Sequence, residues 1–354
     1  MSIKKKILIC YFNEYKINYQ YKLFEVQKFF QKNPKYETII YDKHEVSKTY
    51  SSKNYIKTIN ELENHIINAS LIFVSFYQDI HFIQNLKNFK KNIIVNVWHG
   101  VPLRKIGFDN PIEKNNNLFN AIDWKNIIHL VPNNYAKQIF KTAFSSELEN
   151  IKIIGEIENI NKSFYELIKI LINKTKLFNK KRYILFSPTH DQNFVDKDIT
   201  DRFKIFRNLD EINNILKNSY QELHIKLHQL DQTNIDKLYG FSNIKIISKS
   251  NINNSIKLND YSKFITDISS LINNWLLIKK NNYFLLKGSE TFHKTNLSYG
   301  YIDYLYKTEE YKSFIKFIEK NSYTFDTYLP KKLKSKYLFL TKFKFNNEIN
   351  KLIG

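Results

Sequence analysis

Short apolar runs alternate with amphipathic stretches along this chain, and that alternation constrains the fold more than any other feature of the sequence. Strands that alternate with helices form parallel sheets, because the chain must cross back over the sheet before each new strand. Stretches such as Tyr135 to Phe144 supply the amphipathic segments. In the first half the expected strands are Lys6 to Phe12, Thr38 to Tyr41, Leu71 to Phe76, Ile93 to Val97, Ile127 to Val131 and Ile151 to Ile154.

A second α/β series follows a long amphipathic segment, Asn161 to Phe178, which we expect to be a connecting helix. We therefore predict two parallel α/β domains, residues 1–160 and 161–354, with the last helices packing back on the first domain. The sequence has no internal repeat and no flexible linker, so a ligand is expected in a cleft beyond the carboxyl ends of the strands. The expected elements of the second half are strands at Tyr183 to Phe186, Leu223 to Leu227, Ile244 to Ile247, Phe264 to Thr266 and Tyr283 to Leu286, with helices near Asp201 to Lys217 and Ser269 to Lys280.

Charge and composition exclude several classes of protein. The net charge of +21 would attract phosphorylated substrates, polyanions or an anionic membrane face. The lysines are scattered, and neither zinc-finger spacing nor an RNP-like aromatic signature occurs, so we expect no nucleic-acid partner. The single cysteine, Cys10, excludes an internal disulfide and a thiolate cluster. No apolar run approaches the ~20 residues of a membrane span, and the early one is too short for a signal peptide, so a cytoplasmic protein is expected.

The stretch after the expected strand Ile93 to Val97 carries the first candidate residues. Trp98-His99-Gly100 ends the strand, and Arg104 and Lys105 follow Pro102. A histidine here could act as a general base, and the cations could face phosphate oxygens. Taken alone, the local pattern fits a structural histidine at a strand end slightly better.

Two strand ends of the second half carry further candidates. Ser187-Pro188-Thr189-His190-Asp191 could be a ligand-binding loop or an ordinary entry to a helix. In Glu222 to Gln229, the side chains of His224, Lys226 and His228 share one strand face, with His228 at the carboxyl end. No carboxylate cluster accompanies them, so we expect no metal, and His224 could be satisfied by a neighbouring polar group.

The fourth candidate is the stretch Thr266-Asp267-Ile268-Ser269-Ser270, where a short strand runs into a helix. The free N–H groups and partial positive charge at a helix start attract phosphate, and the hydroxyls could donate further hydrogen bonds. The alternative is that Asp267 or Ser269 is only an N-cap.

Together, these four strand ends resemble the CDP-glycerol glycerophosphotransferase family, whose enzymes make the poly(glycerol phosphate) or poly(ribitol phosphate) of teichoic acids and some capsules. The segment from Trp98 to Gly107 is similar to the family's W-H-G-T-P-L-K-K-I/L-G, which is the most specific element. Ser187-Pro188-Thr189 resembles its A-P-T-W, Lys226-Leu227-His228 its K-L-H-P, and Thr266 to Ser270 its T-D-Y-S-S. The chain departs from the family in lacking the arginine of G-x-P-R after Gly155, and in having His190, Gln229 and Asn274 at motif positions.

The resemblance implies a GT-B-type fold, in which two Rossmann-like domains face each other across a cleft. It also implies transfer of glycerol phosphate or ribitol phosphate from a CDP-activated donor to a hydroxyl of a lipid-linked or polymeric acceptor, with release of CMP and without a cofactor or metal. His99 is then the expected base and His228 the partner of the donor phosphate or leaving group. The residues expected to bind the donor are Gly100, Arg104, Pro188, Thr189, Lys226, Thr266, Asp267, Ser269 and Ser270.

The resemblance places such an enzyme at the cytoplasmic face of the cell membrane, in peripheral contact with it. Two alternatives remain open from the sequence. A nucleotide-sugar glycosyltransferase could use the same two-domain cleft, because a fold does not fix a function. A basic protein without catalytic activity could bind anionic polymers or membrane through its charge alone.

Overall fold

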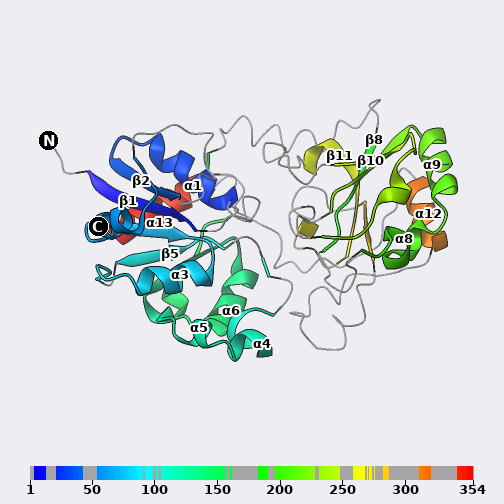
Figure 1. The fold of residues 1–354 in the computed structure, drawn as a ribbon. Coiled ribbons are helices and arrows are strands. Elements are labelled where there is room, and N and C mark those ends of the chain that lie inside the picture. The colour runs from blue at the N-terminus through cyan, green and yellow to red at the C-terminus, as the bar shows by residue number, and fades with distance from the viewer. Residues whose placement is uncertain are drawn as a thin grey trace. The chain divides into compact units, whose positions relative to one another are not determined.

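The computed structural model describes residues 4–12, 21–42, 54–90, 92–98, 101–102, 105–155, 157, 160–161, 182–189, 196–227, 231–247, 258–267, 269, 271–272, 275, 282–286, 311–319 and 341–353. The chain divides into two compact units (Figure 1). One comprises Met1–Leu167 together with Lys331–Gly354, and the other comprises Ile168–Pro330. The domain boundary expected at residue 160 stays a prediction, because the connecting segment that would mark it lies outside the described residues.

The first unit contains a seven-stranded sheet in which all neighbouring strands are parallel. Each of the six strands expected from the sequence is present, and the short edge strand β3 was not predicted, because two residues carry no alternating pattern. In sheet order the strands are β3 (Tyr55–Ile56), β2 (Tyr36–Asp42), β1 (Lys5–Tyr11), β4 (Leu71–Val74), β5 (Ile93–Asn96), β6 (Ile127–Val131) and β7 (Ile151–Ile153).

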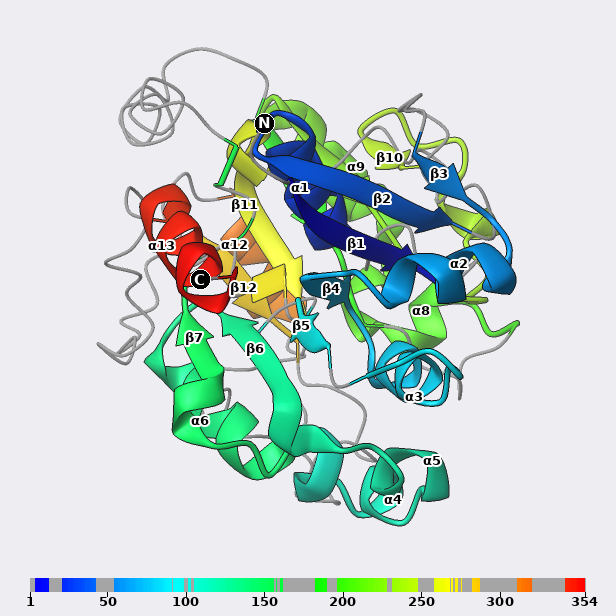
Figure 2. The ribbon, with the colours of Figure 1, turned by 90° about the vertical axis from the view of Figure 1, so that its left-hand side faces the viewer.

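Helices cover this sheet, which explains why its strands are apolar on both faces. The C-terminal helix α13 belongs to this unit (Figure 2). Its residues Phe345 and Ile349 join the core formed by α1 and alternate residues of β1. Lys152 of β7 also forms an ion pair with Glu348 of α13, at 3.8 Å between Nζ and Oε2. The α-helices are α1 (Tyr21–Gln31), α2 (Ile59–Ile66), α3 (Tyr77–Gln84), α4 (Pro111–Lys114), α5 (Asn117–Asn120), α6 (Asn134–Ala143) and α13 (Thr341–Ile353).

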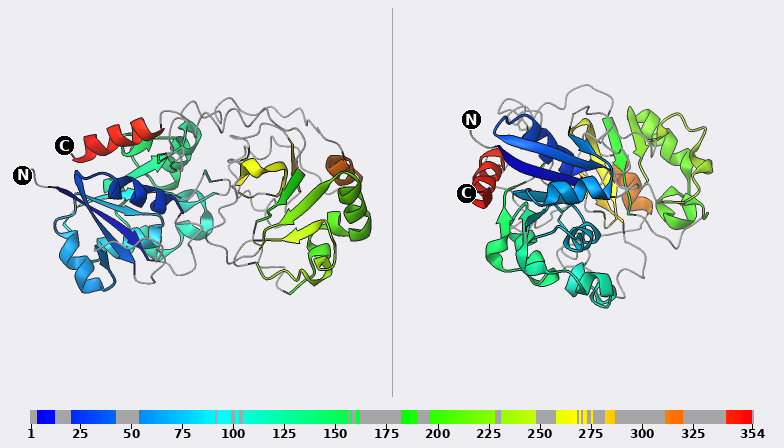
Figure 3. Two further views of the ribbon diagram at one scale, coloured as in Figure 1. Left: turned by 90° about the horizontal axis from the view of Figure 1, so that it is seen from above. Right: turned by 60° about the vertical axis from the view of Figure 1, so that its left-hand side comes forward.

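The second unit contains a five-stranded sheet, again with every neighbouring pair parallel. Its strands, all predicted, are β10 (Ile244–Ile246), β9 (Gln221–Ile225), β8 (Arg182–Phe186), β11 (Tyr261–Thr266) and β12 (Tyr283–Leu285). The helices α9 (Leu209–Asn218) and α12 (Tyr311–Glu319) contact each other and share one core with the sheet (Figure 3). Both sheets reverse strand order about a central strand, as Rossmann-like domains do.

The helix expected near Asp201 to Lys217 is divided into three pieces. The short helix α8 (Ile199–Arg202) ends before Phe203, a 3-10 turn covers Lys204–Phe206, and α9 begins at Leu209. Phe203, Ile205 and Phe206 are all buried, a spacing that one continuous helix could not direct to one core. The side chain of Asn208 then caps α9 by accepting from the N–H of Glu211.

Two further predictions fall wholly or partly outside the described residues. The connecting helix Asn161 to Phe178 is one of them. Of the helix expected from Ser269 to Lys280, Leu271, Ile272 and Trp275 are helical, as predicted. Among the helices that the structure describes, none combines the length and apolarity needed to cross a bilayer.

Candidate active site

Three strand ends of the second sheet lie next to one another because β8 is flanked by β9 on one side and β11 on the other. Backbone hydrogen bonds carry this pairing beyond the strands. The N–H of Ser187 donates to the carbonyl of Ile265 at 2.9 Å, and the N–H of Lys226 donates to the carbonyl of Phe186 at 2.8 Å. The structure thus brings together five of the residues predicted to bind a donor, namely Pro188, Thr189, Lys226, Thr266 and Asp267.

Two of these residues bond to the loop after β8. The Asp267 carboxylate accepts hydrogen bonds from the backbone N–H of Thr189 at 2.8 Å and from its hydroxyl at 2.6 Å. The hydroxyl of Thr266 donates to the carbonyl of Ser187 at 2.7 Å. Because both side chains are buried, these contacts fix the conformation of the loop.

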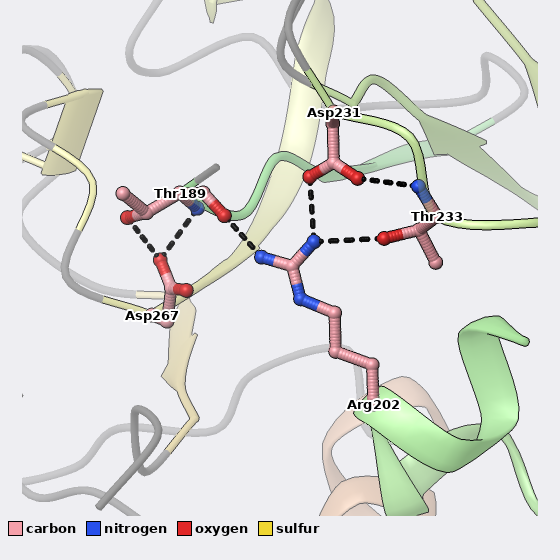
Figure 4. A network of polar contacts seen from close by, with 5 residues as sticks. All are labelled: Thr189, Arg202, Asp231, Thr233 and Asp267. Atoms are coloured by element: carbon pink, nitrogen blue, oxygen red, sulfur yellow. Dashed lines mark hydrogen bonds and ion pairs between the residues drawn. The ribbon is translucent and has the colours of Figure 1, made fainter. Parts of the chain in front are cut away.

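An arginine outside the sequence motifs completes this arrangement. Arg202, at the end of α8, donates through Nη1 to Asp231 at 2.5 Å and to the Thr233 hydroxyl at 3.0 Å, and through Nη2 to the carbonyl of Thr189. We call Thr189, Arg202, Asp231, Thr233 and Asp267 the Arg202 network (Figure 4). A partial signal for it lies in the sequence, since Asp231-Gln-Thr233 forms an Asx turn, with the N–H of Thr233 bonded to Asp231 at 3.0 Å.

Within this network, the charges of Arg202 and Asp231 are matched. The side chains of Arg202 and Asp231 are 3% and 0% exposed. Burial alone would raise the pKa of the Asp231 carboxyl, but the hydrogen bonds from Thr233 and Arg202 together hold that pKa below its usual value. Asp231 is therefore ionised at neutral pH and neutralises the guanidinium.

Lys226 supplies a cation at the end of β9. Its side chain is half-buried, and burial lowers the pKa of its ammonium group. A phosphate oxygen near this ammonium would compensate for the lost hydration and favour the charged form. Lys226 can therefore serve as a counter-charge to a phosphorylated ligand.

The structure accounts for His224 without a metal. Its ring nitrogens lie 3.2 Å from the Tyr261 hydroxyl and 3.3 Å from Glu222, and its ring lies against Tyr183. The sequence was compatible with this role, and the structure confirms that neighbouring polar groups satisfy the histidine. Over the described parts of the chain, no group of three or more His, Cys, Asp or Glu side chains is placed to hold a metal ion.

Ser269 begins the helix that follows β11. Its hydroxyl accepts from the N–H of Leu271 at 3.4 Å, and its carbonyl accepts from the N–H of Ile272 at 3.1 Å. Trp275 is buried against Phe264, with 5.3 Å between ring centroids, and so anchors this helix to β11. The remaining candidates of this unit, His228 and Ser270, lie outside the described residues.

In the first unit, His99, Gly100 and Arg104 also lie outside the described residues, but the residues that lead to them are firmly held. The N–H of Val97 donates to the carbonyl of Val74 at 2.8 Å, which extends the pairing of β5 with β4. Trp98 is buried, with its ring edge-on to Phe140.

A buried histidine supports the same strand end from the neighbouring strand. His129 of β6 lies opposite Asn96, with 3.2 Å between Nδ1 and the Asn96 amide nitrogen, and its Nε2 lies 3.0 Å from the Ser146 hydroxyl. Its ring stacks on Phe144. Complete burial lowers the pKa of His129 to about 3, so the ring is neutral and structural.

Comparisons with known proteins show which family and which fold the chain is similar to. The chain matches the family model described as CDP-Glycerol:Poly(glycerophosphate) glycerophosphotransferase over residues 3–339. A teichoic acid poly(glycerol phosphate) polymerase of Staphylococcus epidermidis is 26% identical over 309 residues, which cover 78% of this chain and 41% of that protein. A protein of the same name from Bacillus spizizenii is 28% identical over 232 residues, covering 59% of this chain and 55% of that protein. The chain thus spans about half the length of the curated relatives it matches.

A solved structure shares the fold. It is the wall teichoic acid polymerase TagF, in a histidine-to-asparagine variant soaked with CDPG. The TM-score is 0.64 at 19% identity, over 99% of this chain and 88% of that one. This likeness confirms the expected GT-B-like fold with two parallel-sheet domains.

Proposed function

Because the chain belongs to the CDP-glycerol:poly(glycerophosphate) glycerophosphotransferase family, we propose that it transfers a polyol phosphate from a CDP-activated donor to a hydroxyl of a growing cell-surface polymer. The oxygen of the acceptor hydroxyl attacks the β-phosphorus of the donor. The bond from that phosphorus to the bridging oxygen breaks, and CMP leaves with the bridging oxygen. The polymer is a teichoic acid or a capsule, and the polyol is glycerol or ribitol.

Phosphoryl transfer asks a protein chiefly to position the reactants and to stabilise charge on the phosphoryl oxygens. We assign His99 the role of base toward the acceptor hydroxyl, and His228 that of donor to the phosphate or leaving group. Gly100 allows close approach to the donor, and Arg104 provides a counter-charge. These assignments rest on the family's motifs and on the position of each residue after a strand.

The observation that carries the proposal is the meeting of three strand ends in the second unit. They gather the Lys226 ammonium, the loop Ser187 to Thr189 and the helix start at Ser269 on one edge of the sheet. A cation and backbone N–H groups at a helix start are the groups that bind a pyrophosphate. Ser270 would add a further hydroxyl.

A panel of donors tests which nucleotide the site accepts. Thermal unfolding is measured with CDP-glycerol, CDP-ribitol, UDP-linked sugars and GDP-linked sugars, each at the same concentration. We expect only the CDP-polyols to raise the melting temperature, because a ligand stabilises the state that binds it. A rise with UDP-sugars alone would identify a nucleotide-sugar glycosyltransferase instead.

The acceptor and the place of action are part of the same proposal. A lipid-linked or polymeric acceptor would bring the enzyme to the cytoplasmic face of the cell membrane as a peripheral protein. The charge of +21 supports attraction to anionic lipid headgroups. Sedimentation with anionic vesicles should fall as salt is raised. Equal sedimentation with neutral vesicles at every salt concentration would contradict membrane binding through this charge.

A further inference from the structure

Arg202 connects three segments that are far apart in the sequence. Through Thr189 it reaches the loop after β8, and through Asp231 and Thr233 it reaches the segment after β9 (Figure 4). Thr189 is in turn bonded to Asp267, which follows β11. Arg202 thus links the ends of β8 and β9 directly, and Thr189 connects them to the end of β11.

Two features indicate that Arg202 does not itself bind phosphate. Its guanidinium is almost completely buried and is paired with Asp231, so its positive charge is already neutralised. Its Nη1 and Nη2 atoms donate to protein oxygens on two different segments, and its guanidinium also lies over the Phe203 ring at 4.6 Å. The planar fork holds the segments at a fixed separation, which a single ammonium group could not do.

We propose that Arg202, paired with Asp231, is a positioning residue that holds the three strand ends in the arrangement required to bind the CDP-activated donor. This role rests on the proposed function. Arg202 places Thr189 where its loop can approach the pyrophosphate. Arg202 also fixes the chain at Asp231, three residues beyond His228. Asp267 then acts on the donor through Thr189, as an acceptor that holds the loop.

Kinetics of the conservative variant Arg202→Lys test this role. We expect the KM for CDP-glycerol to rise at least ~tenfold, while the KM for a synthetic acceptor and kcat change less than ~threefold. A purely structural defect would lower the fraction of active enzyme, and so kcat, without changing either KM. Asp231→Asn provides a second variant with the same expected result. Arg207→Lys is the matched control, because Arg207 is exposed over the Tyr311 ring and lies outside the network.

Hydrogen exchange of the ligand-free protein provides a test that does not depend on the reaction. In Arg202→Lys we expect faster exchange together in residues 186–189, 231–234 and 265–267, and unchanged exchange in β1 and β4. No such change, or faster exchange with an unchanged KM for the donor, would overturn the proposal. Failure of the wild-type enzyme to release CMP would refute the proposed function, and with it the donor role of Arg202. The exchange result would then decide only whether the network fixes these segments.

Discussion

At the scale of single residues, the contacts of Asp267 show that this carboxylate holds the loop after β8. The sequence indicated a ligand for the donor or an N-cap, whereas the structure shows an acceptor for the N–H and hydroxyl of Thr189. A negative charge directed at a pyrophosphate would oppose binding, so its use as a loop acceptor fits the proposed chemistry.

The two variants of Asp267 therefore have different expected effects. Asp267→Asn keeps an oxygen that can accept from Thr189, so the KM for CDP-glycerol should rise only a few-fold. Asp267→Ala removes both hydrogen bonds and should raise that KM by about tenfold or more, given about 1 kcal/mol for each bond. Steady-state kinetics with varied donor measure both. Equal and large losses in the two variants would show that the charge itself is required.

His129 gives the first unit a dependence on pH. The unfolded chain binds a proton at this residue near pH 6.5, whereas the folded protein does so only near pH 3. Above pH 6.5, His129 therefore does not lower the free energy of unfolding. Below that pH, this group alone lowers the free energy of unfolding by about 1.4 kcal/mol per pH unit. The fall continues until the pH reaches the folded-state pKa.

Urea unfolding followed by tryptophan fluorescence measures this effect, because Trp124 lies against His129. Between pH 6.5 and 5, the wild-type protein should lose more unfolding free energy than His129→Gln, whose side chain does not titrate. Parallel pH profiles for the two proteins would contradict a buried neutral histidine.

At the scale of elements, the packing of Gly107 explains why a glycine ends the stretch Trp98 to Gly107 of this chain. It lies at φ +57°, and a Cβ there would be 2.0 Å from the carbonyl oxygen of Ala143, at the end of α6. Gly240 also has a positive φ, at +96°, but a Cβ there meets nothing within 4 Å. The first glycine is required by backbone conformation and by close packing, the second by conformation alone.

Calorimetry of Gly107→Ala and Gly240→Ala separates these two requirements. Gly240→Ala should cost about 1 to 2 kcal/mol, the usual penalty for an L-residue with a positive φ. Gly107→Ala should cost a further ~1–3 kcal/mol, because α6 or the turn must shift to make room. Similar losses in the two variants would mean that the contact with Ala143 relaxes without cost.

How much the sequence predicts depends on the kind of element. The strands were predictable because continuous apolar runs in a parallel sheet are buried on both faces. The break between α8 and α9 was not, because Phe203 and Phe206, three residues apart, still resemble part of an amphipathic helix when read along the chain. Arg202 and Asp231 were missed because 29 residues separate them, and their segments meet through an isolated bridge between Asp198 and Asn234 that leaves no apolar pattern in the sequence.

At the scale of the whole molecule, the order of the candidate motifs was more informative than any one of them. Singly, a histidine after a strand or a Ser-Ser pair before a helix has an ordinary structural explanation. The parallel topology places the second-unit motifs at the carboxyl ends of neighbouring strands, which the alternation of strands and helices predicted. The sequence did not predict the Arg202 network, which supports the carboxyl ends of these strands. Hydrogen bonds between side chains of distant segments leave no periodic pattern in a sequence.

The central claim is that polyol phosphate transfer occurs at these strand ends and depends on the two histidines that follow β5 and β9. Release of CMP from CDP-glycerol and CDP-ribitol, in the presence of an acceptor, measures it most directly. Wild-type enzyme should release CMP, whereas His99→Ala and His228→Ala, folded as judged by circular dichroism, should each lose at least ~100-fold in turnover. Near-wild-type turnover by both variants would contradict the account.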